Sequence, residues 1–288
     1  MELTIELAAV EINRLGYGAM RLTGPGIWGP PTDVPGAIAV LRRAAELGVT
    51  LFDTADSYGP DVSERLIRQA LYPYDCVLIA TKGGFTRQGP DRWAMCGRVA
   101  YLRTCVERSL TNLGIEQIDL WQLHRIDPLV PVEDQFGLIR DLIAEGKIRC
   151  AGLSEVTVEQ LTIAQQYFDV ASVQNLYNLS ARDSEGVLQY CEANGIAFIP
   201  WFPIGRGELA ATRGPLAALA ASHNATAAQL SLSWLLHHSP VTVPIPGTTS
   251  LTHLEENLLA GAIELTPEDM SAIEAVVTPS GVTAAPPE

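Results

Sequence analysis

The chain has 288 residues, 47% of them hydrophobic, so it is long enough to bury a sizeable core. Its formal net charge of −14 at pH 7 argues against a nucleic-acid backbone or an anionic membrane surface as partner, because both repel an acidic protein. No apolar run reaches the ~18 residues of a membrane span, and the acidic first residues do not resemble a signal peptide. We therefore expect a cytoplasmic protein.

The five cysteines are odd in number and scattered, and none falls in a CxxC pair. They are Cys76, Cys96, Cys105, Cys150 and Cys191. We expect reduced thiols in the core or at the surface, and no metal site.

The chain opens with a loosely alternating stretch, residues 3–13, which an Ala-Ala break divides into a predicted hairpin. Residues 14–20 predict a first strand, and the Gly/Pro-rich residues 24–31 a rigid loop. A helix is expected over residues 34–48, with a proline in its first turn and Gly48 as its stop.

Short apolar runs and helical patterns then alternate to the end of the chain. Further strands are expected at residues 49–53, 76–81, 118–123, 148–153, 171–173, 196–200 and 241–244. Further helices are expected at residues 63–71, with Ser63 as N-cap, and at 99–112, 132–145, 158–167, 181–193, 215–222, 226–237 and 251–260. Residues 83–98 form a segment too long for a mere connector, so we expect a substrate loop there.

Eight short strands that alternate with helices, without a linker or a solenoid repeat, predict a closed parallel barrel. The expected fold is an α/β (β/α)8 TIM barrel with an N-terminal β-hairpin, in a single domain over residues 1–288. A barrel of this type uses roughly 250 residues. The open dinucleotide-binding sheet is disfavoured, because no GxGxxG follows the first strand.

Polar residues end five of the apolar runs: Asp53, Lys82, His124, Ser154 and Gln174. In a barrel the carboxyl ends of the strands converge, so these side chains would meet at one face. Taken singly, each could be a turn cap, a solvated charge or a core histidine. Their joint appearance at successive strand ends favours an active site.

The chemistry available to these groups is proton transfer to an oxygen. A tyrosine with a pKa near 10 is a poor acid-base group at neutral pH, but a nearby ammonium lowers that pKa. Tyr58, which follows Asp53 by five residues, would be the acid, with Lys82 as the ammonium and Asp53 as its partner. His124 could donate to a substrate carbonyl.

Six motifs together resemble the aldo-keto reductase superfamily, from the first hairpin to about residue 277. They are FDTADSYG at 52–59, ATK at 80–82, QLHR at 122–125, GLS at 152–154, VQN at 173–175 and IPGT at 245–248. The resemblance implies NAD(P)H-dependent reduction of an aldehyde or ketone. It also implies a catalytic tetrad of Asp53, Tyr58, Lys82 and His124. Residues 14–20 and 24–26 are most similar to short bacterial pyridoxal or general aldehyde reductases.

The resemblance also places a cofactor across the barrel mouth. Ser154 and Gln174 match positions that bind the nicotinamide carboxamide, and Trp201 matches the aromatic residue on which the nicotinamide ring stacks. A flat indole suits a planar ring, although Trp201 could instead be a core aromatic. The other candidate cofactor contacts are Arg206, Gly247, Thr248, Thr249, His253, Glu256 and Asn257.

Two departures from the family pattern concern the cofactor. Glu155 stands where the family usually has asparagine, which puts that carboxamide contact in question. Gly247 and His253 stand where relatives have a lysine and the arginine that grips the 2′-phosphate, and residues 247–257 contain no Lys or Arg. Hydroxyl groups and a helix start near Leu251 can still hold a phosphate, so NADPH is predicted, with NADH as the alternative.

The substrate is expected to be an apolar or aromatic carbonyl compound. Trp28, Phe85, Trp93 and Phe202 are candidate pocket walls, although each could simply pack in a loop. Arg87, Arg92 and Arg125 could meet an anionic group or lie on the surface.

Two alternative functions stay open. The same residues could oxidise an alcohol, or a sugar or pyridoxal hemiacetal, with NAD(P)+. A non-catalytic NADPH-binding regulatory protein is the alternative from another class, and the intact set of four catalytic residues disfavours it. The sequence does not indicate the physiological substrate or the oligomeric state.

Overall fold

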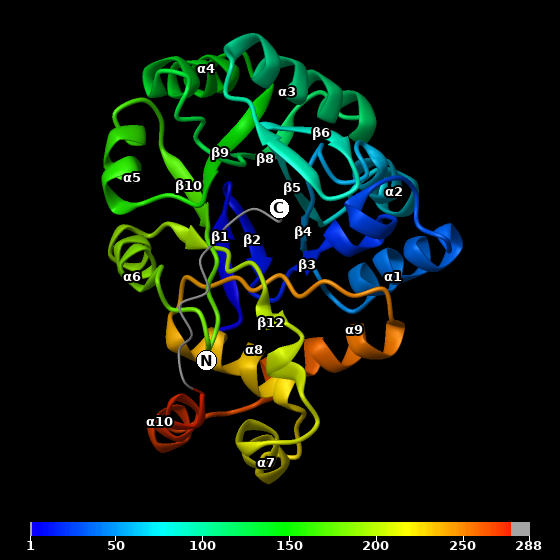
Figure 1. The fold of residues 1–288 in the computed structure, drawn as a ribbon, viewed down its shortest axis with the longest axis vertical. Coiled ribbons are helices and arrows are strands. Elements are labelled where there is room, and N and C mark those ends of the chain that lie inside the picture. The colour runs from blue at the N-terminus through cyan, green and yellow to red at the C-terminus, as the bar shows by residue number, and fades with distance from the viewer. Residues whose placement is uncertain (1, 278–288) are drawn as a thin grey trace.

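The structure is a computed structural model that describes residues 2–277, except for the side chain of Arg206. Its centre is a seven-stranded parallel sheet in the strand order β11-β10-β9-β8-β5-β4-β3. The strands are β3 (Tyr17–Gly18), β4 (Leu51–Asp53), β5 (Leu78–Gly83), β8 (Ile118–Leu123), β9 (Ile148–Ser154), β10 (Val170–Gln174) and β11 (Ala197–Phe198). Figure 1 shows the helices as a ring around these strands.

Residues 241–244 connect the two edges of this sheet. The Phe198 amide donates to Val241 O at 2.8 Å, and the Val243 amide donates to Phe198 O at 2.7 Å. On the other side, the Gly16 amide donates to Pro244 O at 3.0 Å. The predicted eighth strand is therefore present as bridging backbone and not as a regular strand, because Pro244 has no N–H to extend the ladder. The predicted (β/α)8 barrel fold is confirmed.

The N-terminal hairpin closes one end of the barrel. Strands β1 (Thr4–Leu7) and β2 (Val10–Asn13) pair antiparallel, as the alternating sequence predicts. Leu7 and Ile12 are buried against inward side chains of the sheet such as Leu78. The hairpin therefore covers one end of the barrel. The opposite end, at the carboxyl ends of the strands, is where an active site can form.

The helices cover the outside of the sheet. They are α1 (Val34–Glu46), α2 (Val62–Leu71), α3 (Val99–Leu113), α4 (Val132–Ala144), α5 (Val158–Ala164), α6 (Glu185–Asn194), α7 (Pro215–Ser222), α8 (Ala227–His238), α9 (Leu251–Leu258) and α10 (Pro267–Val276). Short 3-10 turns occur at η1 (Ala19–Leu22), η2 (Pro25–Ile27), η3 (Glu208–Ala210) and η4 (Leu259–Ala262). Within residues 2–277, no helix has the length and apolar character needed to cross a membrane.

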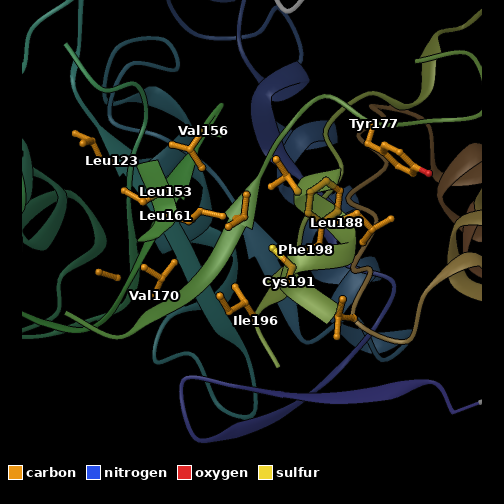
Figure 2. Close-up of a cluster of buried hydrophobic side chains, with 14 of the residues drawn as sticks. Leu123, Leu153, Val156, Leu161, Val170, Tyr177, Leu188, Cys191, Ile196 and Phe198 are labelled. Atoms are coloured by element: carbon orange, nitrogen blue, oxygen red, sulfur yellow. The ribbon is translucent and has the colours of Figure 1, made fainter. Parts of the chain in front are cut away.

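The outer core fills the layer between strands and helices. Figure 2 shows part of this cluster, in which Leu161 of α5 and Leu188 of α6 lie among Leu153, Val170 and other side chains of the sheet. These positions are fully or almost fully buried. Burying one such leucine contributes about 2 kcal/mol, which explains why the apolar face of each helix turns toward the sheet.

The starts of two helices were predicted wrongly, and one helix was missed. Ser63 does not cap α2: Asp61 is the N-cap residue, at φ 63°, and Ser63 is buried, where its hydroxyl accepts from Thr54 Oγ1 at 2.8 Å. The helix expected from residue 181 begins at Glu185, because Asn178 Oδ1 binds the amides of Ser180 and Ala181 in a turn. Helix α10 was not predicted, although Thr266 and Asp269 form a capping box at its start.

Candidate active site

The buried end of the candidate site is an ion pair between the ends of two neighbouring strands. Lys82 Nζ donates to Asp53 Oδ1 at 2.6 Å and to Thr54 O at 2.8 Å. Both charged side chains are almost completely buried. A pair at this depth is costly to desolvate unless its remaining hydrogen-bonding capacity is satisfied.

Two side-chain amides donate to the second carboxylate oxygen of Asp53. Asp53 Oδ2 accepts from Gln174 Nε2 at 2.8 Å and from Gln122 Nε2 at 3.2 Å. The carboxylate is thus held by three donors from three strands. Gln122 was not predicted to have a role; its position two residues before His124 on the same strand face is the signal that could have found it.

Tyr58 and His124 lie next to this pair. Lys82 Nζ is 5.4 Å from the centroid of the Tyr58 ring, and the rings of Tyr58 and His124 are 6.1 Å apart at 78°. Tyr58 follows β4 in a turn in which its amide donates to Ala55 O. The four predicted catalytic side chains, from four different segments, are therefore brought together.

Burial sets the protonation states of these groups. Burial raises the pKa of Tyr58 above its ordinary value, although the Lys82 ammonium acts in the opposite direction. The Lys82 ammonium therefore acts in the predicted direction, but burial outweighs it and the Tyr58 pKa is raised. Burial also lowers the pKa of Lys82, but Asp53 and Tyr58 outweigh it, so that the pKa is raised and Lys82 stays charged.

His124 is neutral at pH 7. Burial and the nearby cations Lys82 and Arg125 hold the pKa of its imidazole well below the ordinary value. Its Nδ1 is buried and has no hydrogen-bond partner among the described residues. A neutral imidazole can still donate one N–H to a carbonyl oxygen.

The segment 83–98 is a hairpin and not an irregular loop. Strands β6 (Phe85–Gly89) and β7 (Arg92–Met95) pair antiparallel, and they bring two aromatic rings to the site. The Phe85 ring lies 4.7 Å from that of His124, and the Trp93 ring lies 6.4 Å from that of Tyr58. Two of the predicted wall residues thus surround the two groups that would face a substrate.

Arg87 fastens this hairpin to its surroundings. Its guanidinium lies 3.6 Å from the Trp93 ring centroid and 5.7 Å from that of Trp28. It also donates to Ser57 O at 2.8 Å and to Gly26 O and Ile27 O at 2.9 Å. Arg87 therefore holds the loops together, and Trp28 belongs to the same stack.

The other candidate groups near the substrate differ in exposure. Arg92 is exposed, whereas Arg125 is half-buried and donates through Nη1 to His124 O at 2.6 Å and to Ser154 Oγ at 3.0 Å. The Phe202 ring packs against Trp201, with the ring centroids 4.7 Å apart. Of the three predicted arginines, Arg125 is the one that donates to a residue of the tetrad, through His124 O.

The nicotinamide-side candidates lie at adjacent strand ends. Ser154 and Gln174 are buried at the ends of β9 and β10, and Trp201 is half-buried just after β11. Because Gln174 Nε2 is bound to Asp53, its amide oxygen is the atom left for a carboxamide N–H. Glu155 is tied to Trp201 through a 2.5 Å bond from the indole Nε1.

The adenosine-side candidates surround the start of α9. Tyr17 OH donates to Thr248 O at 2.5 Å, and Ser250 Oγ accepts from the His253 amide as the N-cap of α9. The first turn of α9 carries no acidic residue, although the chain as a whole is strongly acidic. The N-terminus of a helix without acidic residues in its first turn favours a phosphate.

The remaining cofactor candidates vary in accessibility. Thr249 and His253 are exposed, Gly247 and Glu256 are half-buried, and Asn257 is buried. Arg206 ends strand β12 (Pro203–Arg206), and its side chain lies outside the described part of the structure.

A barrel with an ion pair, a phenol and an imidazole at its open end is the arrangement of a class of oxidoreductases. The model of the aldo/keto reductase family matches residues 14–278, and the chain belongs to this family. The predicted enzyme class, an NADP(H)-dependent oxidoreductase of the aldo-keto reductase type, is thereby confirmed.

Two curated relatives cover most of the chain. An uncharacterized oxidoreductase of Schizosaccharomyces pombe is 52% identical over 94% of this chain and 89% of its own length. Pyridoxine 4-dehydrogenase of Escherichia coli is 39% identical over 95% of this chain and 98% of its own length. The predicted similarity to bacterial pyridoxal-type members agrees with the second of these.

Solved structures share the fold. A thermostable aldo-keto reductase in complex with the inhibitor epalrestat superposes with a TM-score of 0.84 at 29% identity, over 96% of this chain and 100% of that chain. An aldo-keto reductase of Klebsiella pneumoniae in complex with NADPH has a TM-score of 0.82 at 23% identity, over 100% of this chain and 99% of the other.

Proposed function

We propose that the protein reduces an aldehyde or ketone to an alcohol with NADPH, and that Tyr58 is the general acid. The observation that carries the proposal is the buried Lys82–Asp53 pair beside Tyr58, with the neutral His124 next to it. A proton donor and a second N–H donor thus face the same space, under the aromatic rings of Phe85 and Trp93.

Each residue has a separate role in this mechanism. When bound, NADPH supplies the hydride that reduces the carbonyl carbon. Tyr58 protonates the carbonyl oxygen, and the Lys82 ammonium stabilises the phenolate that remains. Asp53, held by Gln122 and Gln174, keeps the ammonium in place. His124 orients the substrate by donating to the same oxygen.

The cofactor assignment rests on complementary groups along the barrel mouth. Ser154 and the Gln174 oxygen would hold the carboxamide, and the Trp201 indole would stack on the nicotinamide ring. At the other end, residues 247–257 would hold the adenosine part, with the start of α9 at a phosphate. Arg206 is proposed as a further phosphate contact.

Oxidation of an alcohol is the second candidate function, because the relative from Escherichia coli is named pyridoxine 4-dehydrogenase. In that direction Tyr58 would have to accept a proton as a phenolate. Burial raises the pKa of Tyr58 and so favours the protonated phenol, which suits reduction. Pyridoxal is a substrate to test, since the aromatic walls suit a planar aldehyde.

Replacement of the phenol hydroxyl tests the mechanism. Tyr58→Phe should lose about 10²- to 10⁴-fold in kcat, the usual value of general acid-base catalysis, and should still bind NADPH. Turnover would be followed by NADPH absorbance over a panel of aldehydes, ketones and pyridoxal, and cofactor binding by calorimetry. Unchanged turnover would remove Tyr58 from the role.

The same panel separates the remaining alternatives. Cofactor binding without turnover of any carbonyl or alcohol by the wild-type protein would support the regulatory alternative. A higher catalytic efficiency with NADH than with NADPH would overturn the cofactor assignment. The cytoplasmic location stays a prediction.

A further inference from the structure

Glu155 occupies an unusual backbone position directly after Ser154. Its φ of 57° lies in the left-handed region, which residues with a Cβ rarely adopt. The Glu155 amide donates to Gln174 O at 3.1 Å, which fixes this conformation at the end of β9. A residue held in such a conformation between two candidate cofactor contacts warrants a functional explanation.

The carboxylate of Glu155 reaches across two strand ends to the indole of Trp201. Glu155 Oε1 accepts from Trp201 Nε1 at 2.5 Å and from the Leu176 amide at 2.6 Å. Both are charge-assisted hydrogen bonds, the stronger kind. The Trp201 amide also donates to Asn175 O, so the residue is anchored at its backbone and at its one polar side-chain atom.

We propose that Glu155 is a positioning residue that fixes the Trp201 indole as the platform for the nicotinamide ring, and that its charge favours NADP+ over NADPH. This inference rests on the proposed function, in which the ring stacks on Trp201. Glu155 stands where the family usually has asparagine. In this proposal it has a role other than direct contact with the carboxamide.

The charge part of the proposal follows from the surroundings of Glu155. The oxidised nicotinamide ring is a cation and the reduced ring is neutral, so a carboxylate at the edge of the platform stabilises the oxidised form more. Arg125 is the cation on this side of the site, and its Nη1 is engaged by Ser154 Oγ and His124 O. No ion pair among the described side chains involves Glu155; its charge acts on the Arg125 cation, whose pKa it acts to raise, without a direct ion pair.

Two substitutions separate the hydrogen bond from the charge. Glu155→Gln keeps an acceptor oxygen for the indole N–H but removes the charge. Glu155→Ala removes both. Glu159→Gln is the matched control, because Glu159 is an exposed acid in the first turn of α5 on the same side of the barrel.

The measurement is the dissociation constant of NADP+ and of NADPH, each by calorimetry. For Glu155→Gln we expect NADPH to bind within about 2-fold of wild type, while the preference for NADP+ falls by about 3- to 10-fold. For Glu155→Ala we expect about 10-fold weaker NADPH binding as well, since a typical charge-assisted bond is worth that much. An unchanged preference in Glu155→Gln, or equal shifts in the Glu159→Gln control, would overturn the charge role.

A readout without cofactor tests the positioning role. In protein labelled with 5-fluorotryptophan, the ¹⁹F line of Trp201 can be assigned by its loss in Trp201→Phe. We expect this line to shift and broaden in ligand-free Glu155→Ala but to stay narrow in Glu155→Gln. A line in Glu155→Ala identical to that of wild type would overturn the positioning role.

Trp201→Ala distinguishes a failure of this inference from a failure of the proposed function. If Trp201→Ala leaves NADPH binding unchanged, the stacking assignment itself is wrong and the role of Glu155 falls with it. If Trp201→Ala weakens binding and Glu155→Ala does not, only the role of Glu155 is overturned. A third outcome is that both single variants weaken NADPH binding while the double variant, Trp201→Ala with Glu155→Ala, binds NADPH as well as Trp201→Ala alone. In that case the two residues act as one unit.

Discussion

The surroundings of Arg125 indicate the charge of the substrate that the site would prefer. Its guanidinium lies 5.6 Å from the Phe85 ring centroid, and it donates through Nη1 to His124 O and Ser154 Oγ. Burial lowers the pKa of Arg125 below its ordinary value, yet the group stays charged at neutral pH. A half-buried cation beside His124 would stabilise an anionic group on a bound carbonyl compound.

This placement predicts a preference that depends on substrate charge. Arg125→Gln should lower kcat/KM for an aldehyde that carries a carboxylate, such as 4-carboxybenzaldehyde, by about 10- to 100-fold, the value of a charge-assisted hydrogen bond. Benzaldehyde should lose no more than about 3-fold. Steady-state kinetics with the two substrates measure the difference, and Arg92→Gln is the control because Arg92 is exposed. Equal losses for both substrates would refute the preference.

Residue identity predicted the tetrad because each of its strand residues ends an apolar run, and that signal is local. Neither Gln122 nor Glu155 ends an apolar run, and their partners Asp53 and Trp201 are 69 and 46 positions away, so these contacts were not predicted. The effect of burial on the pKa of Tyr58 was not predicted, for a similar reason. The sequence indicates the neighbouring ammonium, but the depth of burial depends on the whole fold.

At the scale of elements, the β6–β7 hairpin is the part that could vary independently of the barrel. It pairs with itself, and Arg87 ties it to residues 26, 27 and 57 through backbone carbonyls. Phe85 and Trp93, the two rings nearest Tyr58 and His124, both belong to it. Its position would therefore determine the shape of the proposed substrate pocket.

Arg87→Ala should loosen the hairpin and leave the cofactor site intact. We expect KM for an aromatic aldehyde to rise about 10-fold, because several hydrogen bonds and the stacking on Trp93 are lost together. Arg87→Lys should recover little of this loss in KM, since an ammonium cannot reproduce the planar set of N–H donors of a guanidinium. Steady-state kinetics, NADPH calorimetry and hydrogen exchange of residues 85–95 measure these effects. Unchanged protection of the hairpin would contradict the clamp role.

The elements that sequence patterns predicted well are those with a strong apolar period and a clear stop. Strand β8 was predicted over its full range, and α4 ends as expected before Gly146, which has a positive φ. The hairpin strands were missed because they are short, mix polar with apolar residues and do not join the barrel sheet. The start of α6 was missed because the turn at Asn178 replaces a helical turn.

At the scale of the whole molecule, the fold buries two acids behind the tetrad. Glu64 is fully buried and accepts from Thr81 Oγ1 at 2.7 Å and Asn112 Nδ2 at 2.9 Å. Asp56 is 1% exposed, and neither of its carboxyl oxygens has a hydrogen-bond partner in the described structure. Its amide donates to Lys82 O, so it lies directly behind the catalytic strand end. Burial and the nearby Glu64 raise the pKa of Asp56 to about 7.

The raised pKa of Asp56 makes the stability of the whole protein depend on pH. In the unfolded chain Asp56 titrates near its ordinary pKa of 3.8. Between these two values the folded protein binds the proton more tightly, so this residue lowers stability as pH rises from about 4 to 7. Above pH 7 the cost is complete, and the difference between the two pKa values corresponds to about 4 kcal/mol.

Asp56→Asn removes this titration while keeping the size of the side chain. Relative to wild type, the free energy of unfolding of the variant should increase by about 3 kcal/mol between pH 5 and pH 8, because only the wild type acquires a buried charge over that range. Urea unfolding at a series of pH values measures the difference, with Asp75→Asn as the control because Asp75 is exposed. If the variant and wild type differ in free energy of unfolding by the same amount at every pH, the substitution has changed packing alone. If the advantage of the variant shrinks toward pH 8, Asp56 is stabilised as a carboxylate.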